Sequence, residues 1–98
     1  MKIIVDDKRD FPKGNYNCVR TYEDCIFLLS IFKKITFISL DYDLGTEHTG
    51  YDILVYMFEN GVKPNHINIH SDHCIGVSKM KNFIETHFKN TIITENKL

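Results

Sequence analysis

Three short runs each end in acidic or histidine side chains, and this pattern limits the fold more than any other feature. Two of the runs are mostly apolar and β-branched, and the third alternates isoleucine with polar residues. The runs, with the polar residues that follow them, are 3–5 with Asp6 and Asp7, 35–40 with Asp41 and Asp43, and 66–70 with Ser71, Asp72 and His73. Largely apolar runs of this length are typical of strands covered on both faces, as in a parallel sheet. The sequence therefore predicts parallel strands whose carboxyl ends carry polar residues.

Segments with helical spacing separate these runs. Thr21 fits a helix cap, and the apolar residues after it follow the i, i+3, i+4, i+7 spacing of one helical face: Cys25, Leu28, Leu29 and Phe32. Two further helices are expected after Thr49 and from Gly76, with these residues inward: Leu54, Met57 and Phe58, then Val77, Met80, Ile84 and Phe88. Residues 17–20 and 91–94 are expected as short strands. The alternation predicts an α/β fold with helices on both faces of a parallel sheet.

Composition limits the function classes. The 98 residues suit a single domain, 1–98, and a net charge of −1 argues against a bulk surface for nucleic-acid backbones. No apolar run is long enough to span a membrane, and the apolar start is too short for a signal peptide. The cysteines form no CxxC pair, so we expect reduced thiols in a cytoplasmic protein, with Cys25 and Cys74 as small core residues.

The acidic residues at the strand ends are the first candidates for a site. In a parallel sheet the ligand site lies beyond the carboxyl ends of the strands, where Asp6, Asp7, Asp41 and Asp43 are expected to gather. Four carboxylates in one place repel each other unless a cation or hydrogen-bond donors separate them. Hard oxygen ligands suit Mg²⁺ or another divalent cation. The alternative is that these residues only cap helices and form turns.

Basic and hydroxyl residues at the same edge suggest phosphate chemistry. The guanidinium of Arg9 suits a phosphate, although an ion pair with Asp7 or Asp10 is the alternative, and Arg20 is expected to be structural. An imidazole can transfer protons near neutral pH, which makes His70 a candidate catalyst. Ser71 could donate to a phosphate or cap the next helix, and Gly76 permits a close backbone approach. Weaker candidates for the site are Asp72, His73 and His48.

These motifs together resemble two related families. Asp6, Asp7, Asp41, Gly50 and Ser71 match the acidic pair, phosphorylated Asp, glycine and Ser of the receiver domains of bacterial response regulators. The sequence is more similar to the cyclic-phosphate-processing receiver domain, through Asp-Asp-Lys-Arg at 6–9, Val-Arg-Thr at 19–21, Ser-Leu-Asp-Tyr-Asp-Leu-Gly at 39–45, Thr-Gly-Tyr-Asp at 49–52 and His-Ser at 70–71 with Gly76.

The resemblance covers about residues 3–88. It implies a flavodoxin-like, receiver-like three-layer sandwich with a parallel sheet of about five strands. The first receiver helix is expected to be missing, because the connection between the first strand and residues 17–20 is a loop by composition, with Pro12 and Gly14. It also implies action on cyclic phosphate ends of nucleotides or RNA. The lysine–proline that ends the last strand of receivers is missing, although Lys97 is near.

The leading hypothesis is a domain that binds or hydrolyses a 2′,3′-cyclic phosphate on a small ligand or an RNA end. Asp6, Asp7 and Asp41 would hold the cation; Arg9, Ser71 and Gly76 would hold the phosphate; and His70, Asp41 and Asp43 would be catalytic. The alternative is a non-catalytic protein-interaction module with a relic acidic pocket. A third reading is an aspartyl-phosphate switch at Asp41.

Overall fold

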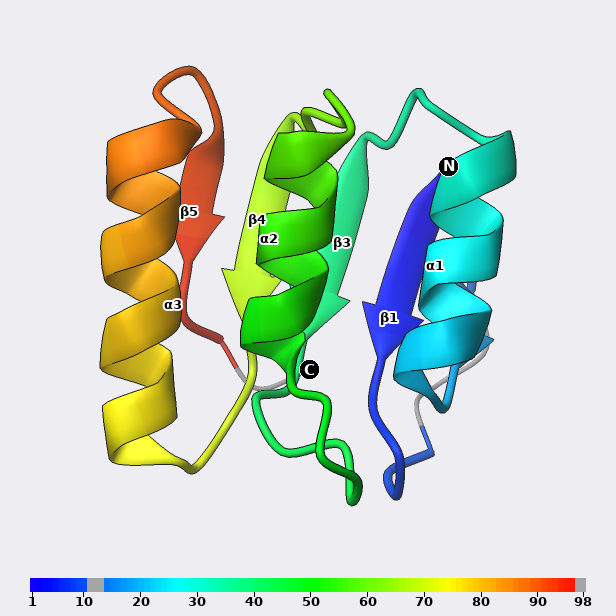
Figure 1. The fold of residues 1–98 in the computed structure, drawn as a ribbon. Coiled ribbons are helices and arrows are strands. Elements are labelled where there is room, and N and C mark those ends of the chain that lie inside the picture. The colour runs from blue at the N-terminus through cyan, green and yellow to red at the C-terminus, as the bar shows by residue number, and fades with distance from the viewer. Residues whose placement is uncertain (11–13, 97–98) are drawn as a thin grey trace.

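A computed structural model describes residues 1–10 and 14–96, and it confirms the α/β, receiver-like fold (Figure 1). The elements, in chain order, are β1 (Lys2–Val5), β2 (Asn17–Val19), α1 (Tyr22–Ile31), β3 (Phe37–Leu40), α2 (Gly50–Glu59), β4 (His66–Ile69), α3 (Cys74–His87) and β5 (Ile92–Thr94). No helix lies between β1 and β2 in the described residues, as the loop composition of this segment predicts. Lys97 lies outside the described part of the chain.

The strands form a parallel sheet in the order β2-β1-β3-β4-β5. Its register brings the ends of the central strands to one level, because Val5 pairs with Leu40 and Leu40 pairs with Ile69. The next residue of each strand is therefore Asp6, Asp41 or His70. The polar residues after these strands meet at the carboxyl edge of the sheet, as predicted.

The three described helices lie on the same side of the sheet (Figure 1), whereas the alternation of strands and helices predicted helices on both faces. They pack side by side, α1 against α2 and α2 against α3. The strand order explains this arrangement. The connections through α1, α2 and α3 all advance in one direction across the sheet, so crossovers of one hand place their helices on one face.

The hydrophobic core lies between this helical layer and the sheet. Alternate strand residues point into it, because successive side chains of a strand face opposite sides. The strand residues in the core are Ile3, Val5, Ile38, Leu40, Ile67 and Ile69. Cys25 and Leu29 of α1, Met57 of α2 and Met80 of α3 meet them from the helical layer. The intervening strand positions Ser39 and Asn68 are buried on the opposite side of the sheet.

Four local expectations are wrong. Phe32 is exposed because α1 ends at Ile31 and Phe32 is its extended C-cap. Phe58 is exposed near the end of α2, where its ring contacts Phe83 and His87. Helix α3 begins at Cys74 rather than Gly76, and Cys74 is exposed in its first turn, whereas Cys25 is buried as expected.

Among the described residues, no helix combines the length and the apolar character that a membrane span requires.

The core of α1 provides a test of the helical layer. Leu29→Ala should lower the free energy of unfolding by about 2–5 kcal/mol, because it removes a fully buried side chain and leaves a cavity. The matched substitution Phe27→Ala, at a residue of the same helix that is 57% exposed, should change the free energy of unfolding by less than about 1 kcal/mol. Urea unfolding followed by circular dichroism measures both. Equal losses in the two variants would contradict this packing of α1.

Candidate functional site

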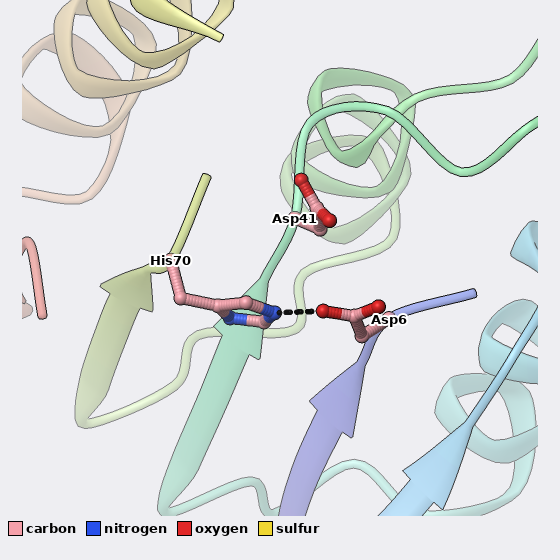
Figure 2. Close-up of side chains that lie close together, drawn as sticks. All are labelled: Asp6, Asp41 and His70. Atoms are coloured by element: carbon pink, nitrogen blue, oxygen red, sulfur yellow. Dashed lines mark hydrogen bonds and ion pairs between the residues drawn. The ribbon is translucent and has the colours of Figure 1, made fainter. Parts of the chain in front are cut away.

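Asp6, Asp41 and His70 converge at the carboxyl edge of the sheet (Figure 2). Each offers one potential ligand atom, and the three atoms lie within 4.8 Å of one another. The side chains of Asp6 and His70 point toward each other, and Asp41 projects from the end of β3 over the same space (Figure 2). Residues 6, 41 and 70 are therefore one cluster, although they are far apart in the sequence.

The carboxylate of Asp6 is buried and well supplied with hydrogen-bond donors. Its Oδ1 accepts the backbone N–H groups of Lys8 and Arg9, each at 2.9 Å, and its Oδ2 lies 3.0 Å from Nε2 of His70. Burial alone raises the pKa of Asp6, but these donors outweigh it, so the pKa lies below its ordinary value. Asp6 is therefore a carboxylate at neutral pH, and it shapes the turn after β1.

The imidazole of His70 is 1% exposed and lies between two partners. Its Nε2 faces Asp6, and its Nδ1 lies 2.6 Å from Oγ of Ser39. Burial lowers the pKa of His70 below its ordinary value of 6.5, although the hydrogen bond and charge of Asp6 act in the opposite direction. The side chain is therefore neutral above about pH 6.5.

Asp41 is the more accessible carboxylate of the cluster. The pKa of Asp41 lies above its ordinary value. Burial raises it most, and the charge of Asp6 raises it further, while a hydrogen bond from the hydroxyl of Ser71 acts in the opposite direction. A cation at this position would offset both the cost of desolvating the charged Asp41 and its repulsion from Asp6. The start of α2 packs directly on the backbone here, since a Cβ at Gly50 would lie 2.2 Å from the carbonyl oxygen of Asp41. Gly50 thus places the helix close behind the cluster.

A pocket of about 320 Å³ opens beside the cluster, and six residues singled out from the sequence line it: Arg9, Asp41, Asp43, Ser71, Asp72 and His73. Arg9 spans this pocket through an ion pair with Asp72 at 3.0 Å, rather than with Asp7 or Asp10. A larger hollow of about 620 Å³ lies around Lys63 and the residues 87–92, away from these side chains. The smaller pocket is the one that joins the acidic cluster.

Several other candidate residues have structural partners. His73 is the N-cap of α3, where its Nδ1 accepts the N–H of Gly76 at 2.9 Å. A Cβ at Gly76 would lie 2.3 Å from the ring of Tyr42, so this glycine makes room for that ring. His48 stacks on Tyr22 with ring centroids 4.0 Å apart. These contacts give His73, Gly76 and His48 structural roles in the fold.

The remaining acidic and basic candidates shape the loops around the pocket. Asp7 lies against Gly45, outside the three-residue cluster. Asp43 accepts the N–H of Gly45 at 2.9 Å and keeps its exposed side chain at the pocket. Arg20 donates to the backbone carbonyls of Asp6 and Arg9, which makes it structural, as expected. The turn that carries Asp6 and Arg9 is thus fixed from β2.

Ser39 and Asn68 are residues that sequence reasoning did not assign to the site. Both are buried polar residues, and Asn68 donates from Nδ2 to Oγ of Ser39 at 2.9 Å. The signal was a polar residue inside an apolar run, two positions before Asp41 and His70 respectively. A spacing of two places these residues on the same face of their strands as the site residues that follow.

The burial of His70 predicts how stability depends on pH. Because folding lowers the pKa of His70, the unfolded chain binds a proton at this side chain more readily than the folded protein does. The contribution of His70 to the free energy of unfolding is therefore fully present above about pH 6.5 and is lost as the pH falls below it. His70→Gln should therefore show a shallower decline between pH 7.5 and 5.5 than the wild type, measured by urea unfolding. His87→Gln, at an exposed position, should keep the wild-type slope. A steep decline that survives in His70→Gln would contradict the assignment.

Comparison with known proteins identifies the family. The model of the cyclic-phosphate processing receiver domain matches residues 1–86. Searches of curated proteins and of solved structures returned no match. The matched region includes β1 to β4, the acidic cluster and nearly all of α3. The chain belongs to the cyclic-phosphate processing receiver domain family.

Proposed function

We propose that this protein binds a 2′,3′-cyclic phosphate at the carboxyl edge of its sheet and hydrolyses it with the help of a divalent cation. The family is associated with cyclic-phosphate processing. The observation that carries the proposal is the junction of an acidic cluster with a small pocket that also contains Arg9 and Ser71. The volume of about 320 Å³ suits a terminal phosphate and its ribose better than a polymer.

The charge of the pocket is the reason for including a cation. Asp41, Asp43 and Asp72 line it together with a single guanidinium, that of Arg9. A phosphate would be repelled by three carboxylates unless a positive charge came with it. Oxygen atoms of Asp6 and Asp41 lie close enough to share one ion, and carboxylate oxygens suit Mg²⁺. Bound there, Mg²⁺ would neutralise phosphate charge and polarise the P–O bonds.

The residues of the pocket would then have separate tasks. Asp6 and Asp41 hold the cation, and Arg9 and Ser71 donate hydrogen bonds to the phosphate oxygens. The hydroxyl of Ser71 turns from Asp41 to the phosphate for this purpose, while the cation compensates Asp41. Asp43, exposed at the rim, orients a water molecule toward phosphorus. The water oxygen forms a new bond to phosphorus and loses its two protons to solvent, one ring P–O bond breaks, and the released ribose oxygen takes one proton from solvent, so that one proton is released overall. The product is a phosphomonoester with one more negative charge.

The position of His70 changes the task that its sequence suggests. From the sequence alone, His70 is a candidate for the acid or base that acts on the substrate. Its ring is buried and its Nε2 faces Asp6, whereas the pocket is lined by other residues. We therefore propose that His70 supports Asp6, and that solvent in the open pocket supplies the proton for the leaving oxygen.

Turnover of cyclic nucleotides tests the proposal. With Mg²⁺ or Mn²⁺, the wild type should convert 2′,3′-cyclic AMP or an RNA ending in a 2′,3′-cyclic phosphate to the phosphomonoester. Asp41→Asn should reduce kcat/KM at least 100-fold, because it removes a cation ligand. Glu59→Gln makes the same change of charge at an exposed residue of α2 and should leave the rate unchanged. If neither substrate is converted, the catalytic role is contradicted.

A thermal scan separates the proposal from the alternative of a non-catalytic interaction module. A cation that binds the folded state stabilises it by RT ln(1 + [L]/Kd), about 1.4 kcal/mol at ten times Kd. Mg²⁺ should therefore raise the melting temperature of the wild type by roughly 7 °C and leave that of Asp41→Asn unchanged. An identical response of both proteins would place the cation effect outside this cluster.

Arg9 tests the phosphate contact separately from the cation. Arg9→Gln removes the guanidinium that faces the pocket. It should raise KM for the cyclic phosphate about tenfold or more, because a charge-assisted hydrogen bond is lost. The melting response to Mg²⁺ should remain. A KM equal to that of the wild type would show that Arg9 serves only its ion pair with Asp72.

A further inference from the structure

A continuous line of hydrogen bonds crosses the side of the sheet opposite the helices and ends at Asp6. Its successive contacts are His66 Nε2 to Thr94 Oγ1 at 2.7 Å, Thr94 Oγ1 to Asn68 Oδ1 at 2.6 Å, Asn68 Nδ2 to Ser39 Oγ at 2.9 Å, Ser39 Oγ to His70 Nδ1 at 2.6 Å and His70 Nε2 to Asp6 Oδ2 at 3.0 Å. The last four side chains are buried. The line joins four strands or strand ends to the candidate site.

The backbone of Asn96 fixes the orientation of Asn68. The N–H of Asn96 donates to Oδ1 of Asn68 at 3.0 Å, and the carbonyl of Asn96 accepts from Nδ2 at 2.8 Å. A backbone N–H can only donate and a carbonyl can only accept, so an inverted amide would lose both bonds. Asn68 therefore presents an N–H, and not an oxygen, to the hydroxyl of Ser39.

This orientation determines how Ser39 meets His70. The hydroxyl oxygen of Ser39 accepts from Asn68, and its own proton can be donated to Nδ1 of His70 at 2.6 Å. On the other side of the ring, the carboxylate of Asp6 can only accept, so Nε2 must carry the proton that joins them. Both neighbours favour the same neutral form of the imidazole, the one protonated on Nε2.

We propose that Ser39, oriented by Asn68, is a positioning residue that holds His70 in the form protonated on Nε2. His70 is then a hydrogen-bond donor to Asp6 and not a ligand of the cation, because a protonated ring nitrogen has no lone pair to offer. The cation of the proposed function would be held by oxygen atoms of Asp6 and Asp41. Only this last consequence rests on the proposed function; the protonation of the ring concerns the protein alone.

Nitrogen NMR of the full chain tests the assignment directly. Long-range ¹H–¹⁵N spectra at pH 7.5 distinguish a protonated ring nitrogen from an unprotonated one. We expect Nε2 of His70 to be protonated and Nδ1 to be unprotonated, both without Mg²⁺ and with saturating Mg²⁺. A proton on Nδ1, or the loss of the Nε2 proton when Mg²⁺ is added, would overturn the proposal.

Variants at Ser39 test the positioning role. Ser39→Ala removes the donor to Nδ1, so the Nδ1 resonance should move toward the value of a nitrogen without a hydrogen bond. The Kd for Mg²⁺, measured by calorimetry, should rise about tenfold. Ser39→Thr keeps a hydroxyl and should retain both wild-type values. An Nδ1 resonance that is the same in the wild type and Ser39→Ala would overturn the role of Ser39.

The outcomes separate this inference from the proposed function. If the wild type neither binds Mg²⁺ nor hydrolyses a cyclic phosphate, the proposed function fails, while the Nδ1 and Nε2 signals of the metal-free protein still decide the inference. If Ser39→Ala does not fold, the wild-type spectra and Ser39→Thr decide it. Turnover with an unprotonated Nε2 would retain the function and reject the inference.

Discussion

The carboxyl edge of the sheet depends on keeping a negative charge buried at Asp6. Burial opposes that charge, and the N–H groups of Lys8 and Arg9 together with His70 offset the cost. The same contacts define the turn after β1 and connect it to the end of β4. A charged side chain thus fixes the geometry of the edge, and the loss of any one donor would leave part of its burial uncompensated.

The fold brings the other groups to this charge through register and close packing. Parallel pairing of β1, β3 and β4 aligns Asp6, Asp41 and His70 at one level. Gly50 lets α2 begin against the backbone of Asp41. Arg20 reaches from beyond β2 to the carbonyls of Asp6 and Arg9. Several elements therefore fix the position of the pocket. On the side of the sheet opposite the helices, the described residues form no helix (Figure 1).

The sequence predicted the strands, their parallel arrangement and most residues of the pocket, because apolar runs and the polar residues after them are local signals. It did not predict that the helices share one face, since that depends on the order of strands in the sheet. It proposed His70 as a catalyst without indicating that the ring is buried with its Nε2 facing Asp6. Burial and hydrogen-bond partners across strands arise only from tertiary structure, so single residues such as Ser39 gave too weak a signal.

The family membership of the chain and the geometry of its strand ends support the proposal that Asp6 and Asp41 would share a divalent cation beside a pocket for the phosphate. Paramagnetic broadening by Mn²⁺ in ¹H–¹⁵N spectra tests this claim most directly. The account predicts that substoichiometric Mn²⁺ first broadens the amide signals of residues 6–9, 41–43 and 70–72 and spares those of residues 83–90. Broadening centred on another group of acidic residues, or no selective broadening at all, would contradict it.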